Sequence, residues 1–205
     1  MKSLVLSKNI PLKLVLASTS VYRRMLLEKL RIPFAVDRPE VDETALPGEA
    51  PADLALRLSR AKAAAVAPRH PGALIIGSDQ VATFDGQVMG KPGNRDNAVR
   101  QLRQLSGRNV SFLTGVCVHN ADTGRQSARL VPCEVGFRTL DDNAIERYLA
   151  KEQPYDCAAS AKAEALGIAL LTRMEGPDPN ALIGLPLIAL VDLLAEHGFS
   201  VLDQP

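Results

Sequence analysis

Three separate segments between residues 62 and 91 each carry a charged side chain in a pattern suited to a reactive centre. Asp79 ends the apolar run LIIGSD, Lys91 lies in a Gly-Lys-Pro tripeptide, and Lys62 interrupts the Ala-rich stretch RAKAAAVA. A carboxylate at the end of a buried strand can hold a metal ion or orient an attacking water. Each residue also has an ordinary explanation: an Asp that caps a turn, a lysine at a hairpin exit, and a lysine that extends to solvent.

A fourth segment, LVLASTSVYRR, changes from apolar residues to hydroxyl side chains and then to paired arginines. It predicts a strand that ends near Ser18, turns and opens a helix. A helix N-terminus presents unpaired N–H groups and a positive partial charge, which suit an anion. Arg23 and Arg24 add permanently charged planar donors that match phosphate geometry. The segment therefore indicates a phosphate-binding turn, and a plain Ser cap followed by solvated arginines is the alternative.

Two irregular segments carry further candidate side chains. Glu40, Asp42 and Glu43 lie in the acidic, proline-containing segment DRPEVDETALPGEA. Clustered carboxylates can hold a hard cation such as Mg²⁺, although a solvated acidic loop has the same composition. Nearer the C-terminus, Lys162 and Glu164 lie among small residues in CAASAKAEALG, where a ligand could approach closely and where a surface turn would look the same.

Apolar periodicity and turn residues predict the elements that must position these side chains. The predicted strands cover 14–17, 34–36, 74–81, 110–119, 129–137 and 168–173. The predicted helices cover 21–30, 51–66, 94–105, 142–149 and 186–196. Strands and helices mostly alternate, while Asp85-Gly86 between two short apolar runs indicates a hairpin. The expected fold is therefore α/β, with a mixed sheet that includes antiparallel pairs.

Composition limits the class of protein. The chain has 205 residues, 46% of them hydrophobic and 23% charged, which suits one globular domain over 13–205 preceded by a loose extension over 1–12. A formal net charge of +1 and the lack of Trp give no indication of a nucleic-acid partner. No apolar run approaches the ~20 residues that span a bilayer. The three cysteines lack metal-site or disulfide spacing, so we expect a reducing, cytoplasmic location.

Taken together, the motifs resemble those of the Maf-like nucleoside triphosphate pyrophosphatases. The shared motifs are LVLASTSVYRR, PEVDE, RAKA, IIGSDQ, GKP, LSG at 105–107, TGV at 114–116 and GLPL at 184–187. Members of this family hydrolyse a nucleoside triphosphate to the monophosphate and pyrophosphate with a divalent metal. The resemblance therefore implies a Mg²⁺ or Mn²⁺ cofactor, an elongated mixed sheet flanked by helices, a deep nucleotide cleft and a homodimer.

The resemblance also implies roles for individual residues. Asp79 matches the family's proton acceptor, and Glu43 matches a catalytic or metal-linked glutamate, so these two carboxylates are expected to hold the metal. The residues expected around the phosphates are Ser18, Arg23, Arg24, Lys62, Lys91 and Lys162.

Three further residues resemble the YceF-type branch of the family, which is associated with 7-methyl-GTP. They are Tyr22, Gln80 and Glu164. Methylation at N7 makes guanine cationic, so an aromatic ring can stack on the base and a carboxylate can accept from its N–H groups. Val21 departs from the family's usual Pro, and Tyr22 replaces the Trp that is frequent in this branch. The alternatives are a dTTP, UTP or modified-pyrimidine triphosphate pyrophosphatase and a non-catalytic, nucleotide-binding regulator of septation.

Overall fold

The computed structural model describes residues 12–204, so the extension predicted for residues 1–12 lies almost wholly outside the described residues. The strands are β1 (Lys13–Ala17), β2 (Phe34–Asp37), β3 (Ala73–Phe84), β4 (Gln87–Met89), β5 (Asn109–Asn120), β6 (Gln126–Phe137) and β7 (Leu171–Glu175). The helices are α1 (Val21–Glu28), α2 (Pro51–Val66), α3 (Arg95–Leu105), α4 (Asp142–Glu152) and α5 (Leu187–Glu196), with short 3₁₀ segments at 67–69, 158–160 and 166–170.

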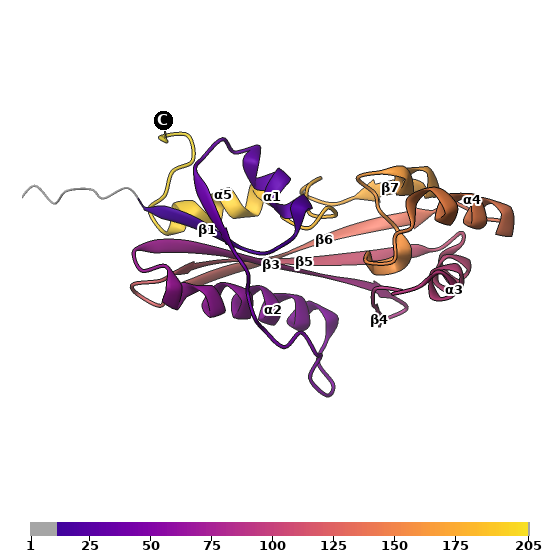
Figure 1. Ribbon diagram of the computed structural model, residues 1–205, viewed down its shortest axis with the longest axis horizontal. Helices are drawn as coiled ribbons and strands as arrows, with labels where there is room; N and C mark the ends of the chain where they lie inside the picture. Colours follow the sequence, from indigo (N-terminus) through magenta and orange to yellow (C-terminus); the bar gives the residue numbers. More distant parts are fainter. Residues whose placement is uncertain (1–11, 205) are drawn as a thin grey trace, which may run out of the picture.

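The strands form one seven-stranded mixed sheet in the order β2-β1-β3-β5-β6-β7, and β4 pairs with β3. Strands β2, β1 and β3 are parallel, whereas the remaining pairs are antiparallel. The sheet is elongated: α2 lies along one face, α1 and α5 lie on the other, and α3 and α4 lie at the far end (Figure 1). The predicted mixed α/β fold is therefore confirmed. Within residues 12–204 no helix is long and apolar enough to cross a bilayer.

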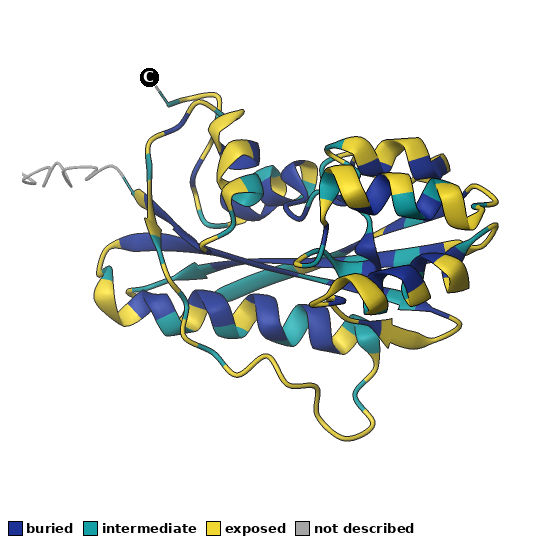
Figure 2. Cartoon of the chain, turned by 45° about the vertical axis from the view of Figure 1, so that its right-hand side comes forward, coloured by how far each residue is buried: buried dark blue, intermediate teal, exposed yellow. Residues whose placement is uncertain are grey.

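Side-chain alternation along β3 decides which residues face which helix. Leu74 and Ile76 are buried in the cluster that includes α1 and α5, while Ile75 is buried in the cluster that includes α2. Because successive side chains of a strand point to opposite faces, this alternation turns Asp79 towards α2 and Gln80 towards the other face. The buried sheet and its exposed outer helix surfaces can be followed in Figure 2.

Helix α2 packs directly on the sheet because two glycines lie beneath it. A Cβ atom at Gly77 would lie 2.1 Å from the backbone oxygen of Ser59, and one at Gly115 would lie 2.4 Å from that of Ala55. Neither approach is possible for a residue with a side chain. The close contact buries Lys62 on α2 and directs it to the sheet, although lysine is rarely buried without a partner.

The hairpin prediction is confirmed, whereas the predicted strand before it is too short. Asp85 and Gly86 both adopt positive φ, of 48° and 75°, as a type I′ turn requires. The strand predicted over 74–81 continues to Phe84, because its last residues pair with β4 and β5.

The strand predicted over 168–173 begins too early. Residues 166–170 form a 3₁₀ turn, and β7 begins only at Leu171. The turn folds tightly on the preceding segment, since a Cβ atom at Gly167 would lie 2.5 Å from the backbone nitrogen of Lys162. The apolar run in the sequence therefore marks a partly buried turn, with Gly167 and Leu170 inside, before a short edge strand.

Two predicted helix ends also differ from the structure. The helix predicted over 21–30 ends at Glu28, because the next residues form i→i+3 hydrogen bonds and Arg31 then adopts a left-handed φ of 53°. The helix predicted over 142–149 continues for almost one turn more and ends where Gln153 adopts a left-handed φ of 49°. Left-handed residues other than glycine give little signal in a single sequence.

Candidate active site

A cleft opens where β1 ends beside the longer strand β3. Ala17 pairs with Gly77, so β3 carries Asp79 beyond the carboxyl end of its parallel neighbour. Ligands of open α/β sheets gather at this kind of edge. The cleft has a volume of about 1160 Å³. Of the residues singled out in the sequence, it is lined by Ser18, Tyr22, Arg23, Glu40, Glu43, Lys62, Asp79, Gln80, Lys91 and Glu164.

At the floor of the cleft, the Lys62 ammonium lies between two carboxylates. Its Nζ atom is 2.6 Å from Asp79 Oδ1 and 2.6 Å from Glu43 Oε1. The side chains of Lys62 and Asp79 are 7% and 10% exposed, whereas that of Glu43 is 57% exposed. Desolvation opposes ionisation of Glu43, but the hydrogen bond from Lys62 and the surrounding positive charges outweigh it and lower the pKa of this carboxyl.

Glu43 reaches this position on an exposed loop, residues 38–50, that runs from β2 to α2 (Figure 2). Arg57 on α2 holds the loop: its Nε and Nη2 atoms donate to Glu49, and Nη2 also donates to the backbone oxygen of Thr44 at 3.0 Å. The hydrogen bond from Arg57 lowers the pKa of the Glu49 carboxyl to about 2. The loop that carries Glu43 is thus fastened to α2, on which Lys62 also lies.

The turn after β1 supplies hydroxyl groups and a guanidinium. Ser18 Oγ accepts a hydrogen bond from the Ser20 N–H at 3.1 Å, and Ser20 Oγ caps α1 by accepting from the Arg23 N–H at 3.4 Å. Arg23 Nε donates to the backbone oxygen of Gly184 at 2.9 Å, which fixes the direction of the side chain. Desolvation lowers the pKa of the Arg23 guanidinium, and the nearby carboxylates oppose this effect. The segment therefore has the groups expected of a phosphate-binding turn.

Arg24 does not reach the cleft. Its side chain is 62% exposed and pairs with Glu28 one turn along the helix, with Nε and Oε1 2.9 Å apart. Consecutive residues of an α-helix point in directions about 100° apart, and here Arg23 is directed to the Gly184 oxygen while Arg24 is directed to Glu28. The expectation that Arg24 contacts the phosphates is therefore corrected: of the pair, only Arg23 lines the cleft.

Lys162 also lies elsewhere than expected. Its Nζ atom is 3.0 Å from Glu152 Oε1 and 5.5 Å from the centre of the Tyr22 ring, in cation–π geometry. Both partners raise the pKa of the Lys162 ammonium. The structure thus places Lys162 beside the aromatic residue expected to contact the base, and not beside Lys62 and Asp79. The Lys162 ammonium thus lies over the ring of Tyr22, which itself lines the cleft.

Gln80 is another lining residue of the cleft, and its side-chain amide is fixed by hydrogen bonds. Its Nε2 atom lies within 2.9–3.0 Å of three acceptors, Thr114 Oγ1 and the backbone oxygens of Ala181 and Leu182. Both amide hydrogens are therefore used within the protein, and only the amide oxygen can be offered to a ligand. Glu164 lies at the mouth of the cleft and reaches solvent, and its partial desolvation raises the pKa of its carboxyl.

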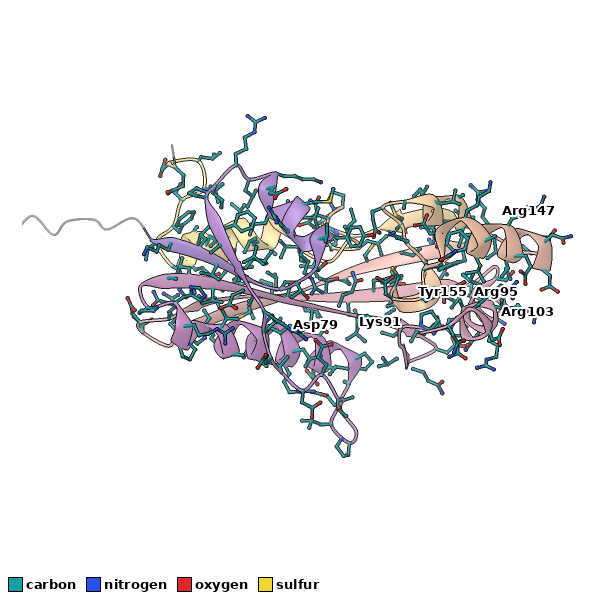
Figure 3. The ribbon with its side chains drawn as sticks, in the orientation of Figure 1. Asp79, Lys91, Arg95, Arg103, Arg147 and Tyr155 are labelled. Atoms are coloured by element: carbon teal, nitrogen blue, oxygen red, sulfur yellow. The ribbon has the colours of Figure 1, made fainter. Side chains whose placement is uncertain are left out.

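Lys91 completes the positive charge of the cleft from the segment after the β4 hairpin. It lies farther along the sheet than Asp79, towards α3 (Figure 3). Its charge is among those that lower the pKa of Glu43, which places the two side chains in electrostatic reach. Lysine donates to phosphate as a compact point charge, so Lys91 extends the cationic lining of the cleft from Arg23 and Lys62.

Several residues that shape the site were missed in the sequence. Arg57 forms a hydrogen bond with the loop that carries Glu43. Gly77 has no side chain, and this allows α2 to pack closely on the sheet. Asp178 is 2% exposed and accepts hydrogen bonds from the Asn180 N–H and, across ten residues, from the Ile188 N–H at the start of α5. The Asp-Pro-Asn sequence signals a turn, but it does not reveal that the same carboxylate caps a later helix.

The two carboxylates suit a hard divalent cation. Glu43 Oε1 and Asp79 Oδ1 both lie 2.6 Å from one nitrogen, so they are separated by at most twice that distance. Among residues 12–204, no three Asp, Glu, His or Cys side chains form a complete metal cluster. Mg²⁺ commonly takes only one or two carboxylates and completes its shell with water and substrate phosphates. The donor set therefore fits a metal that binds together with a triphosphate.

A cationic cleft with paired carboxylates, at the edge of parallel strands in a mixed sheet, defines a phosphate-binding α/β enzyme site. The chain belongs to the Maf family, because residues 13–197 match the family model described as Maf-like protein.

Three relatives are similar over nearly their whole length, and each is named 7-methyl-GTP pyrophosphatase. The protein of Nitrosospira multiformis is 56% identical over 195 residues, which cover 95% of this chain and 98% of the relative. That of Methylobacillus flagellatus is 57% identical over 189 residues, covering 92% and 98%. That of Bordetella pertussis is 56% identical over 193 residues, covering 94% and 96%. Pyrophosphatases of this family generally depend on a divalent metal.

Proposed function

We propose that this protein is a nucleoside triphosphate pyrophosphatase that hydrolyses 7-methyl-GTP to 7-methyl-GMP and diphosphate. The observation that carries the proposal is that one cleft is lined by three cations, Arg23, Lys62 and Lys91, and by the Asp79 carboxylate, which pairs with Lys62. The chain that forms this cleft is 56% identical, almost end to end, to a protein named for this activity.

The phosphate end of the cleft performs the reaction. Asp79 orients the attacking water and accepts its proton as the new P–O bond forms, and the α–β anhydride bond breaks to release diphosphate. Lys62 has three ammonium hydrogens, so two can remain on the carboxylates while the third donates to a phosphate oxygen. Arg23 and Lys91 neutralise the triphosphate and the charge that develops on the leaving group.

The proposed cofactor is Mg²⁺ or Mn²⁺, held by Glu43 and Asp79. When bound, the ion neutralises phosphate charge and polarises the phosphoryl group. Glu43 suits this role because its carboxylate is partly exposed and lies on the same ammonium as Asp79.

The base end of the cleft accounts for the choice of 7-methylguanine. The methylated ring is cationic, and the Tyr22 ring in the cleft lining can stack on it. Gln80 offers only its amide oxygen, which suits the N–H edge of guanine, and Glu164 can accept from the same edge. Uracil and thymine rings carry no positive charge, so they gain less from the aromatic and carboxylate groups.

A substrate panel tests this proposal. The protein is incubated with Mg²⁺ or Mn²⁺ and, in parallel, with 7-methyl-GTP, GTP, UTP or dTTP, and released pyrophosphate is measured. We expect the highest kcat/KM for 7-methyl-GTP. A preference for UTP or dTTP would refute the assignment of the base-contacting residues, and binding without pyrophosphate release would indicate a regulator.

Oligomeric state, location and partners complete the proposal. We propose that the protein is a homodimer, and light scattering after size-exclusion chromatography tests this. We also propose a cytoplasmic location, and fractionation of cells tests it. The partner in the reaction is a small-molecule nucleoside triphosphate, and we expect no binding of nucleic acid or membranes.

A further inference from the structure

Gln101 connects two segments that both contribute residues to the lining of the cleft. It is half-buried in the middle of α3 and is not itself part of the cleft lining. Its Nε2 atom donates to the backbone oxygen of Gly90 at 3.0 Å, and its Oε1 atom accepts from Ser160 Oγ at 2.6 Å. One side-chain amide therefore holds the residue before Lys91 and, on its other side, the loop that contains Glu164.

The loop on the base side has a backbone that needs outside support. Ala159 and Ser160 are consecutive residues with left-handed φ of 57° and 54°, and neither is a glycine. Such conformations persist where surrounding contacts enforce them. Ser160 is fully buried, its hydroxyl donates to Gln101, and its backbone oxygen accepts from the Tyr148 hydroxyl at 3.2 Å. The residues on either side of this pair, among them Ala158 and Ala161, line the cleft.

The segment on the phosphate side is held in a similar way. Gly90 accepts from Gln101, and the Pro92 backbone oxygen accepts from Asn97 Nδ2 at 2.8 Å, so two α3 side chains flank Lys91. A single backbone bond, from the Gly93 N–H to the Tyr155 oxygen at 2.9 Å, also joins this segment to the base side. Lys91 and Tyr155 are both labelled in Figure 3, between Asp79 and the α3–α4 end of the sheet.

We propose that Gln101 is a positioning residue that fixes the Lys91 segment relative to the base-side loop, residues 157–164, and thereby aligns the triphosphate with the base. The inference rests on the proposed function of the cleft. Its physical basis is geometric, since a substrate held at both ends reacts well only when the two holding segments keep a fixed separation.

Two variants test the two hydrogen bonds of the Gln101 side-chain amide one at a time. Gln101→Glu keeps an acceptor for Ser160 but loses the donor to Gly90, whereas Ser160→Ala loses only the bond on the base side. Gln101→Leu removes both bonds. Gln104→Leu is the matched control, because Gln104 is an exposed residue on the same helix and its side chain forms no hydrogen bond with residues 12–204.

Hydrogen exchange of the protein without substrate tests the positioning directly. Gln101→Glu should speed exchange in residues 90–93 alone, Ser160→Ala in residues 157–164 alone, and Gln101→Leu in both segments. Gln104→Leu should match the wild-type protein. Unchanged exchange in both segments of Gln101→Leu would overturn the proposal, and so would equal changes in the Gln104 variant.

Kinetics distinguish positioning from a merely structural role. Gln101→Glu should lower kcat about tenfold and keep the preference for 7-methyl-GTP over GTP. Ser160→Ala should reduce that preference by roughly fivefold or more and leave kcat for GTP nearly unchanged. A common loss of both properties in both variants would overturn the assignment. If the wild-type protein hydrolyses none of the triphosphates, the proposed function fails, while the exchange experiment still decides the role of Gln101.

Discussion

Replacing Lys62 by Met tests the electrostatic arrangement at the floor of the cleft. Methionine has a similar length and packs well in apolar surroundings, so the substitution removes the charge with little change in volume. It leaves Asp79, whose side chain is 10% exposed, facing the Glu43 carboxylate without the ammonium that now joins them. Removing one partner of a buried ion pair costs about 3–5 kcal/mol. Glu43 is largely exposed and screened by water, so we expect a loss of about 2 kcal/mol.

The pH dependence of this loss gives the sharper test. In the wild-type protein the pKa of Glu43 is lowered despite its desolvation, chiefly by Lys62. A carboxyl whose pKa is lowered by folding stabilises the protein above its unfolded value of about 4.3, and this contribution disappears as the pH falls. In Lys62→Met the two carboxylates repel each other instead, and protonation of one relieves the repulsion. The difference in stability between the variant and the wild type should therefore be largest near neutral pH and shrink at about pH 4.

Urea denaturation measures this difference. The free energy of unfolding is determined for both proteins at about pH 8, 6 and 4.5, with Lys151→Met as the control, because Lys151 is an exposed lysine at the end of α4. The control should lose less than about 0.5 kcal/mol at every pH. A stability loss in Lys62→Met that is no larger than in the control, or that does not shrink towards low pH, would refute the reasoning.

Four further predictions concern other parts of the site. Gly77→Ala should destabilise the protein by about 3 kcal/mol in urea and abolish turnover, because the new Cβ would lie 2.1 Å from the Ser59 backbone oxygen; full activity would contradict the close helix–sheet contact. Arg57→Gln should lower kcat about tenfold with little loss of stability, because the hydrogen bond to the backbone oxygen of Thr44, next to Glu43, is lost; unchanged kcat would exclude this role. Cys157 should react slowly with iodoacetamide at about pH 8, as followed by peptide mass spectrometry, because burial raises the pKa of its thiol to about 12; rapid alkylation would contradict that environment. Treatment with EDTA should stop pyrophosphate release, and added Mg²⁺ or Mn²⁺ should restore it; activity that persists in EDTA would refute the metal requirement.

Much of the architecture follows from local sequence patterns. Alternating strand and helix periodicities predict the mixed sheet, and the Asp-Gly pair predicts the β3–β4 hairpin. Asp79 could be singled out because it ends the apolar run LIIGSD, although β3 continues past it to Phe84. Its partner on α2 could not be derived from spacing, because the contact depends on Gly77 and on how closely the helix approaches the sheet.

The residues that were misplaced lack a local signal for direction. Arg23 and Arg24 are adjacent on a predicted helix, and only the rotation of α1 on the sheet shows which one faces the cleft. Lys162 lies in an irregular segment with no periodicity to orient it. Its partner Glu152 lies beyond the helix end that the sequence predicts, so their pairing could not be anticipated. Long-range contacts of this kind require the tertiary structure.

Pyrophosphate release by Asp79→Asn tests the central claim most directly. The substitution keeps the shape of the side chain but removes the base, and we expect turnover of 7-methyl-GTP to fall by roughly 10²–10⁴-fold. Asp85→Asn is the matched control, because Asp85 lies in the exposed hairpin turn at a φ of 48°, which asparagine tolerates. We expect wild-type turnover for the control and near loss of turnover for Asp79→Asn in a folded protein. Turnover of Asp79→Asn within about twofold of the wild type would contradict the account.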